Sequence, residues 1–377
     1  TERLSSRWLR FVIKSLLTEF ADKMADALPE KIIKEYQLLP TQKAIWQIHF
    51  PNSLTLAKKA RERFSFENLF FLSLWVLKER AKLNKENAFS VPLNLELVQK
   101  LVKSLPFKLT DAQKKACWQI LKDLEKSRPM NRLLEGDVGS GKTVVAAIAA
   151  LNTVKSGYQA AFMAPTEILA KQHFKTVSEL LNNFKLNIGL LTGQEDKFIS
   201  KKLKNETIEI SRQKLLEKTK KGEIDILIGT HALIQDQVKF APPPGGLALV
   251  ILDAKHRFGV EQRAKLTQQS TIPHLLSMTA TPIPRTLTLT IYGDLDLSLI
   301  DELPKGRKKI ETRVIPPAER NKAYCFIRKE VKKGRQVFVI CPRIEKSEIR
   351  NPKSETMGWT EAKAVKEEYE KLSKKVF

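Results

Sequence analysis

The chain has 377 residues, 42% of them hydrophobic and 29% charged, a mixture that can fill two or three cores and excludes a disordered chain. Lys and Arg number 66 against 42 Asp and Glu, and the net charge of +24 indicates nucleic acid or an anionic surface as a partner. Cys117, Cys325 and Cys341 lie too far apart for a disulfide framework or a zinc site, so a reducing compartment is expected. No apolar run reaches the roughly 20 residues of a membrane span, and the N-terminal residues lack the apolar stretch of a secretory signal.

Residues 1–106 have the pattern of helices. Apolar residues recur at spacings of three and four from Leu9 to Leu17 and again from Phe70 to Leu77, and glycine is absent from the whole stretch. Aromatic residues at helical spacing are more often core than surfaces for stacking bases. We therefore expect Phe70, Phe71 and Trp75 to be buried.

Residues 107–303 alternate short apolar runs with helical segments, which predicts an α/β fold with a mostly parallel sheet buried on both faces. The segment PKGRKK, residues 304–309, has the composition of a linker. Residues 310–377 begin a further domain. We expect strands in KIETRVIPP (309–317) and GRQVFVICP (334–342), and a polar helix in TEAKAVKEEYEKLSKK (360–375).

The most specific motif is GDVGSGKT, residues 136–143, which fits G-x-x-x-x-G-K-[ST] without a gap. A predicted strand over 132–134 precedes it and an Ala-rich helix follows. In such a loop, glycines let backbone N–H groups surround phosphate oxygens, and the helix N-terminus adds partial positive charge. The alternative is a Gly-rich turn that holds no ligand. The predicted phosphate-binding residues are Gly136, Gly139, Ser140, Gly141, Lys142 and Thr143.

Within this loop, Lys142 is expected to reach the β- and γ-phosphates and Thr143 to hold Mg²⁺. A second Mg²⁺ ligand is expected at the end of a parallel strand, and Asp253 follows the apolar run 247–252. A capping Asp after a buried strand would look the same. The five histidines show no paired spacing for a metal, so they are interpreted as polar contacts.

Two further segments are less specific indicators of a nucleotide site than the phosphate loop. Gln113 lies just upstream of the loop, where a side-chain amide can donate to and accept from adenine, although a surface glutamine on a helix is the alternative. The run Ser277–Thr281 has small hydroxyl residues that could couple the γ-phosphate site to a DNA strand, or could simply form a turn at a strand end.

The phosphate loop, the segment from Asp253 and the segment from Ser277, with four further runs, together resemble the RecG family of superfamily-two DNA helicases over nearly the whole chain. Residues 40–80 resemble the family's helical connector, and HRFGVEQR is far more specific than a general helicase motif. The repair-coupling translocases share TATPIPRTL, but the helical connector and the run HRFGVEQR favour RecG. The resemblance is carried by LTDAQKKA (109–116), GDVGSGKT (136–143), APTEILAKQH (164–173), LLTG (190–193), GTHALIQ (229–235), DAKHRFGVEQR (253–263) and SMTATPIPRTL (277–287).

The resemblance implies a RecA-like, P-loop motor lobe over 107–303, a helical connector over 1–106, and the start of a second RecA-like lobe over 310–377. It also implies an ATP-dependent DNA helicase of recombination and repair, active in branch migration and fork reversal. ATP and Mg²⁺ would be the cofactors, and branched DNA, such as forks and Holliday junctions, the partner. The family acts mainly as a monomer in the bacterial cytoplasm and has no membrane partner.

The family's residue roles carry over to matching positions. Gln113 would read adenine; Lys142, Asp253 and His256 would be catalytic. Asp253 would bind Mg²⁺ with Thr143, and His256 and Thr279 would link nucleotide state to DNA contact. The residues expected along the DNA-facing edge are Pro165, Thr166, Thr192, Gly193, Thr230 and His231.

The chain departs from the family in three places. Where the family has Asp-Glu-x-His, this sequence reads Asp253-Ala254-Lys255-His256, and Lys255 cannot replace the missing carboxylate because an ammonium only donates. The segment after residue 306 is far shorter than the roughly 150 residues of a typical domain, so the arginines of the second lobe are not present. No sequence for the family's wedge domain is visible.

Two hypotheses follow from these departures. The chain is either a RecG-type helicase or part of one, or a remnant that at most binds nucleotide and DNA. A separate chain could supply the missing lobe. A partial second lobe would also leave an unpaired strand edge and exposed apolar surface.

Overall fold

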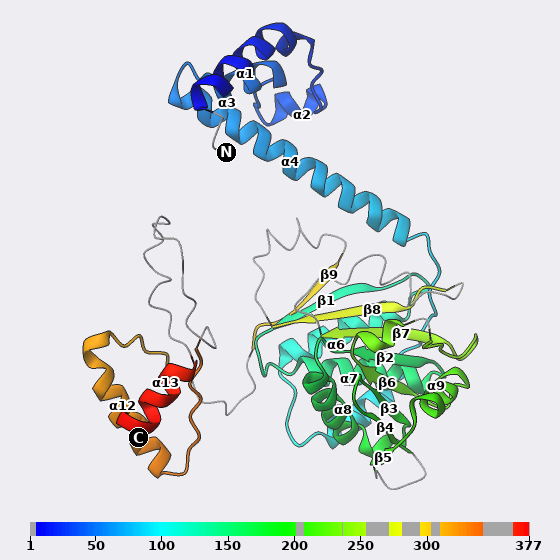
Figure 1. Cartoon of the computed structure of the whole chain (residues 1–377). Coiled ribbons are helices and arrows are strands. Elements are labelled where there is room, and N and C mark those ends of the chain that lie inside the picture. The colour runs from blue at the N-terminus through cyan, green and yellow to red at the C-terminus, as the bar shows by residue number, and fades with distance from the viewer. Residues whose placement is uncertain are drawn as a thin grey trace. The chain divides into compact units, whose positions relative to one another are not determined.

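The structure is a computed structural model, and it describes residues 5–200, 207–235, 237–253, 271–280, 295–302, 310–341 and 365–376. The chain divides into two compact units, Thr1–Arg307 and Lys308–Phe377 (Figure 1). The predicted helical connector and first motor lobe both lie in the first unit. Among the described residues, every helix is too short or too polar to span a membrane.

Helices make up the first part of the first unit, residues 5–104, which we call the helical region. Side-chain caps explain several of the helix starts: Ser5, Ser53 and Asn94 each accept a hydrogen bond from a backbone N–H three residues ahead. The helices are α1 Ser6–Phe20, η1 Ala21–Lys23, α2 Glu30–Glu35, α3 Thr41–His49, α4 Leu54–Leu83 and α5 Leu95–Ser104.

A buried arginine organises the helical region. Arg63 of α4 is fully buried and donates to the Leu39 carbonyl at 3.0 Å, the Thr41 hydroxyl at 3.0 Å and the Asp26 carboxylate at 2.5 Å, and it also pairs with Glu67. Burial acts to raise the pKa of Asp26, but backbone N–H groups, the Thr41 hydroxyl and Arg63 outweigh it and hold the pKa below its ordinary value. Three separate segments are thus joined through one guanidinium.

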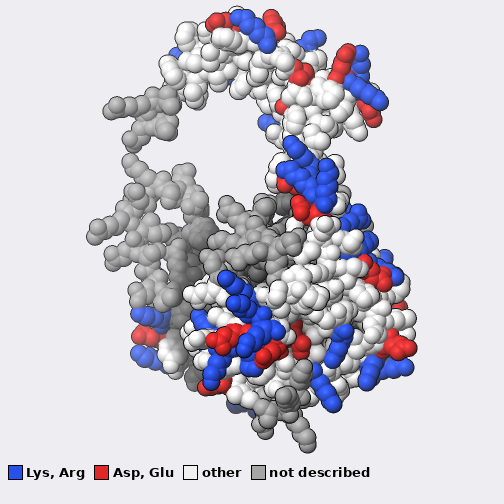
Figure 2. All heavy atoms as spheres, turned by 90° about the vertical axis from the view of Figure 1, so that its right-hand side faces the viewer, with Lys and Arg blue, Asp and Glu red and all other residues white. Residues whose placement is uncertain are grey.

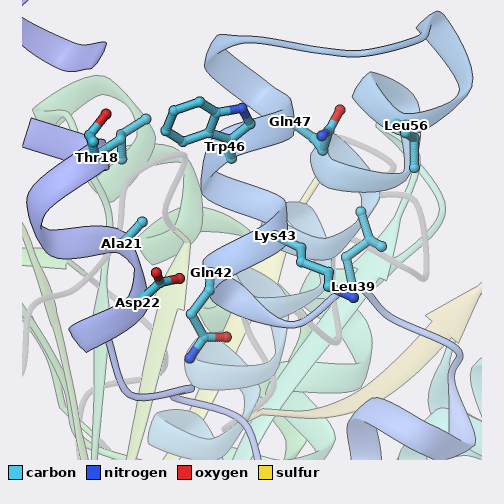
Figure 3. A pocket seen from close by; sticks show the side chains of 10 residues that line it. Thr18, Ala21, Asp22, Leu39, Gln42, Lys43, Trp46, Gln47 and Leu56 are labelled. Atoms are coloured by element: carbon cyan, nitrogen blue, oxygen red, sulfur yellow. The ribbon is translucent and has the colours of Figure 1, made fainter. Parts of the chain in front are cut away.

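A pocket of about 480 Å³ lies within the helical region, between α1, η1, α3 and α4. Figure 3 shows the Trp46 indole in its upper part, with Asp22 and Gln42 at the other end. The pocket shares no residue with the predicted nucleotide or DNA site.

Helix α4 does not bury the aromatic residues that the pattern assigned to a core. Phe71 is 40% exposed and Trp75 57% exposed, so the prediction of burial is wrong for these two. The physical reason is that apolar residues surround the helix over 69–77, whereas its described packing partner, α3, contacts another part of it. Leu69, Leu74 and Leu77 are at least half exposed as well.

The rest of the first unit is a nine-stranded sheet in the order β5-β4-β3-β6-β2-β7-β8-β1-β9 (Figure 1). All pairs are parallel except β3-β4 and β4-β5. The predicted mostly parallel α/β fold is therefore confirmed. The strands are β1 Asn131–Gly136, β2 Gln159–Met163, β3 Ile188–Leu191, β4 Asp196–Ile199, β5 Thr207–Glu209, β6 Ile226–Gly229, β7 Leu247–Asp253, β8 His274–Thr279 and β9 Asp296–Ile300.

Alternate residues of each central strand point to opposite sides of the sheet, and here both sets are apolar. Helices therefore cover both faces of the sheet. Along β7, Ile251 joins the apolar cluster that includes α6 and α7, while Val250 and Leu252 join the smaller cluster beside α9. Helix α7 is apolar nearly all round and is buried from Val144 to Val154. The lobe's helices are α6 Asp111–Leu124, α7 Lys142–Lys155, α8 Glu167–Leu180, η2 Asn182–Phe184, α9 Arg212–Lys220 and η3 His231–Ile234.

The second unit contains η4 Pro317–Glu319, α12 Arg320–Lys332, α13 Val365–Lys371 and the π-helical turn η5 Leu372–Val376. The tail is helical, as predicted, where it is described. The predicted strands over 309–317 and 334–342 are wrong for the described residues, 310–317 and 334–341, which form none. A strand needs a neighbour for its N–H and C=O groups, and the described part of this unit contains no such neighbour. Phe338 and Ile340 are accordingly 86% and 91% exposed.

Candidate functional site

Apart from Gln113 on α6, the predicted site residues that the structure describes end or follow six adjacent parallel strands, whose carboxyl ends meet at one edge of the sheet. Three of these strands, β1, β7 and β8, lead to the phosphate loop, Asp253 and Thr279. The other three, β2, β3 and β6, lead to the segments expected to face DNA. Residues far apart in the sequence are therefore brought to one edge, in a nucleotide half and a DNA half. Ala254 and His256 lie outside the described residues.

The phosphate loop depends on glycine at three points. Gly139 and Gly141 have φ angles of 77° and 91°, a left-handed conformation that strains other residues. At Gly136, a Cβ atom would lie 2.5 Å from the Ser140 Oγ and 3.1 Å from the Ile300 Cβ, so no side chain fits. Helix α7 then starts at Lys142 without a side-chain cap, which leaves its first N–H groups available to an anion.

Lys142 lies inside this loop. Its ammonium donates to the carbonyls of Gly136 at 2.7 Å and Asp137 at 2.9 Å. Burial lowers the pKa of Lys142, and the carboxylates of Asp253 and Asp137 oppose that shift without cancelling it. The structure thus brings together Lys142 and Asp253, which are 111 positions apart in the chain.

Asp253 is held by a histidine that the sequence indicated only as a polar contact. Its Oδ2 lies 2.6 Å from the Nε2 of His173 on α8. The His173 ring packs against Phe162 of β2, with ring centroids 4.5 Å apart. A signal was present in the sequence, because His173 falls on the buried stripe of α8 with Ala170 and Val177, where a polar side chain needs a partner.

Gln113 also reaches the phosphate loop. It is 2% exposed, its Nε2 donates to the Ser140 carbonyl at 2.6 Å, and its Oε1 accepts from the Thr110 N–H at 2.9 Å. With Thr110 it forms the capping box that starts α6. In this structure the amide supports the loop, and its predicted contact with adenine stays a prediction.

The residues fit a nucleotide phosphate with Mg²⁺. The Ser140 hydroxyl is buried at the turn of the loop and has no hydrogen-bond partner among the described residues. Thr143 and Asp253 supply oxygen atoms, and Mg²⁺ is typically bound through one or two protein oxygens together with substrate phosphates and water. The described residues contain no cluster of three or more His, Cys, Asp or Glu that could hold a metal ion by itself.

In the DNA half, two segments are tied together through the start of α8. Thr166 caps this helix by accepting from the Leu169 N–H at 3.3 Å, and the next residue, Glu167, accepts from the Gly193 N–H at 2.8 Å. Thr192 is buried and its hydroxyl donates to the Glu195 carbonyl at 2.7 Å. The start of α8 and Gly193 are thus adjacent, and Thr166 and Gly193 are both exposed.

The remaining predicted residues lie on the same edge. Pro165 follows β2, and Thr230 and His231 follow β6, the strand between β2 and β3. Thr279 ends β8 opposite Glu135 of β1, so it belongs to the nucleotide half. On the face drawn in Figure 2, Lys and Arg are interspersed with Asp and Glu rather than gathered in one patch.

Comparison with known proteins agrees with this arrangement. Residues 110–290 match the DEAD/DEAH box helicase family. The ATP-dependent DNA helicase RecG of Synechocystis is 44% identical over 379 residues, a match that covers 100% of this chain and 42% of that protein. RecG of Thermotoga maritima is 41% identical over 100% of this chain and 45% of its own.

A solved structure, described as RecG bound to a three-way DNA junction, is 38% identical with a TM-score of 0.72. The match covers 89% of this chain and 43% of that one. The chain therefore spans less than half the length of the relatives it matches.

Proposed function

We propose that this chain, a RecG-like protein with a DEAD/DEAH box helicase lobe, binds ATP and Mg²⁺ at the carboxyl edge of its sheet as the first motor lobe of an ATP-dependent DNA helicase. The observation that carries the proposal is the pairing of an unbroken phosphate loop with Asp253, delivered by a separate strand within electrostatic reach of Lys142. Identity to RecG proteins over the whole of this chain, and under half of theirs, supports the same assignment.

Each residue of the nucleotide half has a definite task in this proposal. The backbone N–H groups from Gly139 to Thr143 would surround the β- and γ-phosphates, and the Ser140 hydroxyl would gain a partner. Lys142 would exchange its two loop carbonyls for phosphate oxygens, and Thr143 and Asp253 would hold Mg²⁺. The cation would neutralise phosphate charge.

Turnover is proposed to be impaired. The sequence has Ala254 where RecG-like proteins carry the glutamate that orients and deprotonates water. Loss of a general base costs about 10²- to 10⁴-fold in rate. A second candidate function follows from Ala254: a remnant that binds nucleotide and DNA without catalysis.

Branched DNA is the proposed partner, with the recombination and repair roles of RecG, because a relative's structure is described with a three-way junction. Thr166, Gly193 and Thr230 would contact the DNA backbone, together with Pro165 and His231. The prediction of a DNA contact is wrong for Thr192, because it is fully buried and its hydroxyl is bonded to Glu195. Contacts of this kind are mainly to phosphates, so affinity should fall steeply as salt rises. Bacterial relatives and three free cysteines favour a bacterial cytoplasm.

The test measures binding and turnover on one sample. A fluorescent ATP analogue is titrated with Mg²⁺, and phosphate release is then followed with and without a three-way DNA junction. We expect binding, little release, and a loss of affinity of roughly 10- to 150-fold for Lys142→Ala, which removes hydrogen bonds to a charged group. Absence of binding by the unaltered chain would refute the proposal, whereas junction-stimulated release would refute impaired turnover.

Replacing Ala254 tests the two candidate functions against each other. Ala254→Glu restores the family's carboxylate, but we expect no unwinding of a branched DNA, because the described residues of the second unit form no strand of a second motor lobe. Unwinding gained by this single change would show that the missing carboxylate alone disables the chain.

A further inference from the structure

We infer that His173 is a positioning residue for Asp253. It holds one oxygen of that carboxylate on the protein side of the site, so that the other oxygen is kept available for Mg²⁺. The inference rests on the proposed nucleotide site and assigns a task to a residue that belongs to neither the phosphate loop nor the strand of Asp253.

The direction of the hydrogen bond follows from the chemistry of the two groups. An ionised carboxylate only accepts, so the Nε2 of His173 donates to the Oδ2 of Asp253. The separation of 2.6 Å is short for a nitrogen donor, as expected of a charge-assisted bond. The His173 side chain is 8% exposed and that of Asp253 28%, so the bond lies on the buried side of the carboxylate.

Packing fixes the position of the donor. The His173 ring lies against Phe162, and Phe162 is opposite Ile251 in the β2–β7 register, two residues before Asp253. His173 itself is 7% exposed. The ring has little room to turn, so Asp253 meets a donor that is in place before any ligand arrives.

A fixed donor behind a metal-binding carboxylate has a measurable effect. Residues that orient a ligand from behind typically contribute about 10- to 100-fold to metal affinity. The effect should appear in the concentration of Mg²⁺ that is required, and not in the contacts of the nucleotide with the loop, because His173 touches Asp253 and no residue of GDVGSGKT in any contact described for it.

The experiment compares three variants of the full chain. His173→Leu removes the donor, His173→Gln keeps an amide N–H at nearly the same reach, and Phe174→Leu is a control for packing on the same helix. Each is titrated with a fluorescent ATP analogue in EDTA, and then with Mg²⁺ at a fixed analogue concentration. Thermal unfolding is recorded in parallel.

We expect His173→Leu to need about 10- to 100-fold more Mg²⁺ at half-saturation, with unchanged nucleotide affinity in EDTA. His173→Gln should recover most of the loss, and Phe174→Leu should lower thermal stability without changing the Mg²⁺ requirement. If His173→Leu does not fold, His173→Asn, whose amide is one methylene shorter than that of Gln, takes its place.

Three outcomes would overturn the inference. The first is an equal Mg²⁺ requirement for His173→Leu and the unaltered chain. The second is an equal change in His173→Leu and Phe174→Leu, which would make His173 a packing residue only. The third, no nucleotide binding by the unaltered chain, would overturn the proposed function together with this inference, whereas the first two leave that function standing.

Discussion

The nine-stranded lobe and the helical region are stabilised in different ways. The lobe buries whole strands and an apolar helix, α7, between its layers. In the helical region the largest fully buried side chain is a charged one, Arg63, bound to two carboxylates, a hydroxyl and a carbonyl. A buried charge is tolerated only while its partners are in place, whereas an apolar core spreads its stabilisation over many contacts. The two regions should therefore respond differently to a single substitution.

Removing Arg63 should have the largest effect. Arg63→Leu leaves the carboxylates of Asp26 and Glu67 without their buried partner, and loss of one partner of a buried ion pair typically costs about 3–5 kcal/mol. We expect amide hydrogen exchange to accelerate from α2 to the first half of α4 while the sheet stays protected. Lys34→Leu, in the exposed pair with Glu30, is the matched control and should change nothing measurable. Equal exchange in both variants would contradict the role of Arg63.

A cavity in the lobe should have the next largest effect. Leu151 of α7 is fully buried, and Leu151→Ala should destabilise the lobe by about 2–5 kcal/mol. The Cys117 thiol can report this loss of stability. Burial raises the pKa of the thiol to about 12, so the thiol should react with a thiol reagent only when the lobe opens. Labelling is measured with Cys325 and Cys341 changed to Ser.

The matched control for this cavity is Leu77→Ala, at a position 60% exposed on α4. It should leave the labelling rate of Cys117 unchanged, since surface substitutions usually fall within about 0.5 kcal/mol. Labelling as slow in Leu151→Ala as in this control would mean that the lobe does not depend on the packing of α7.

Lowering the pH should weaken the lobe before the helical region, and this effect should be smaller than those of the two substitutions. Burial lowers the pKa of His274 below 6.5, although the Phe89 carbonyl and Asp123 oppose the shift. Its Nδ1 accepts from the Met130 N–H at 3.0 Å, and its Nε2 donates to the Phe89 carbonyl at 2.7 Å, so the folded ring is neutral. Because the unfolded ring binds more protons, the stability that neutral His274 contributes is present above about pH 6.5 and is lost as the pH falls toward its folded pKa.

In the helical region, the pKa of Asp26 is held below 3.8, so its contribution persists until the pH falls below about that value. Unfolding in denaturant is measured at pH 7.5 and at pH 5.5, with amide hydrogen exchange reporting separately on the lobe and on the helical region. The comparison shows which region loses stability first. His274→Gln should make the lobe less dependent on pH in this interval. A helical region that weakens first would contradict the assignment.

The sequence predicted the features that local spacing determines. Alternating apolar runs gave the parallel sheet, and the run ending at Asp253 gave the end of β7. Contacts between distant segments were not predictable in this way: the hydrogen bond from His173 to Asp253 spans 80 positions and depends on the packing of α8 against the sheet. Arg63 was missed for another reason, because a fully buried arginine is rare and no pattern indicates its partners.

The wrong predictions have a common cause. Periodicity measures how apolar a segment is, but burial requires a partner. Both Trp75 on α4 and the stretch around Phe338 have the apolar pattern of a core and remain exposed among the described residues. A pattern of this kind predicts that a surface can be covered without identifying what covers it.

The position of β1 has a consequence for the synthesis of the chain. Its two neighbours, β8 and β9, are both made long after it, and Gly136 lies opposite Ile300 in the register. At about 5–20 residues per second, the roughly 160 residues between them take about 10 to 30 s to translate. For most of that time the strand that leads to the phosphate loop has neither of its partners, since β8 is completed only at Thr279, and the nascent lobe cannot complete its sheet before β9 leaves the ribosome. Any nucleotide-dependent stabilisation of this lobe therefore begins only after the chain has been made past Ile300.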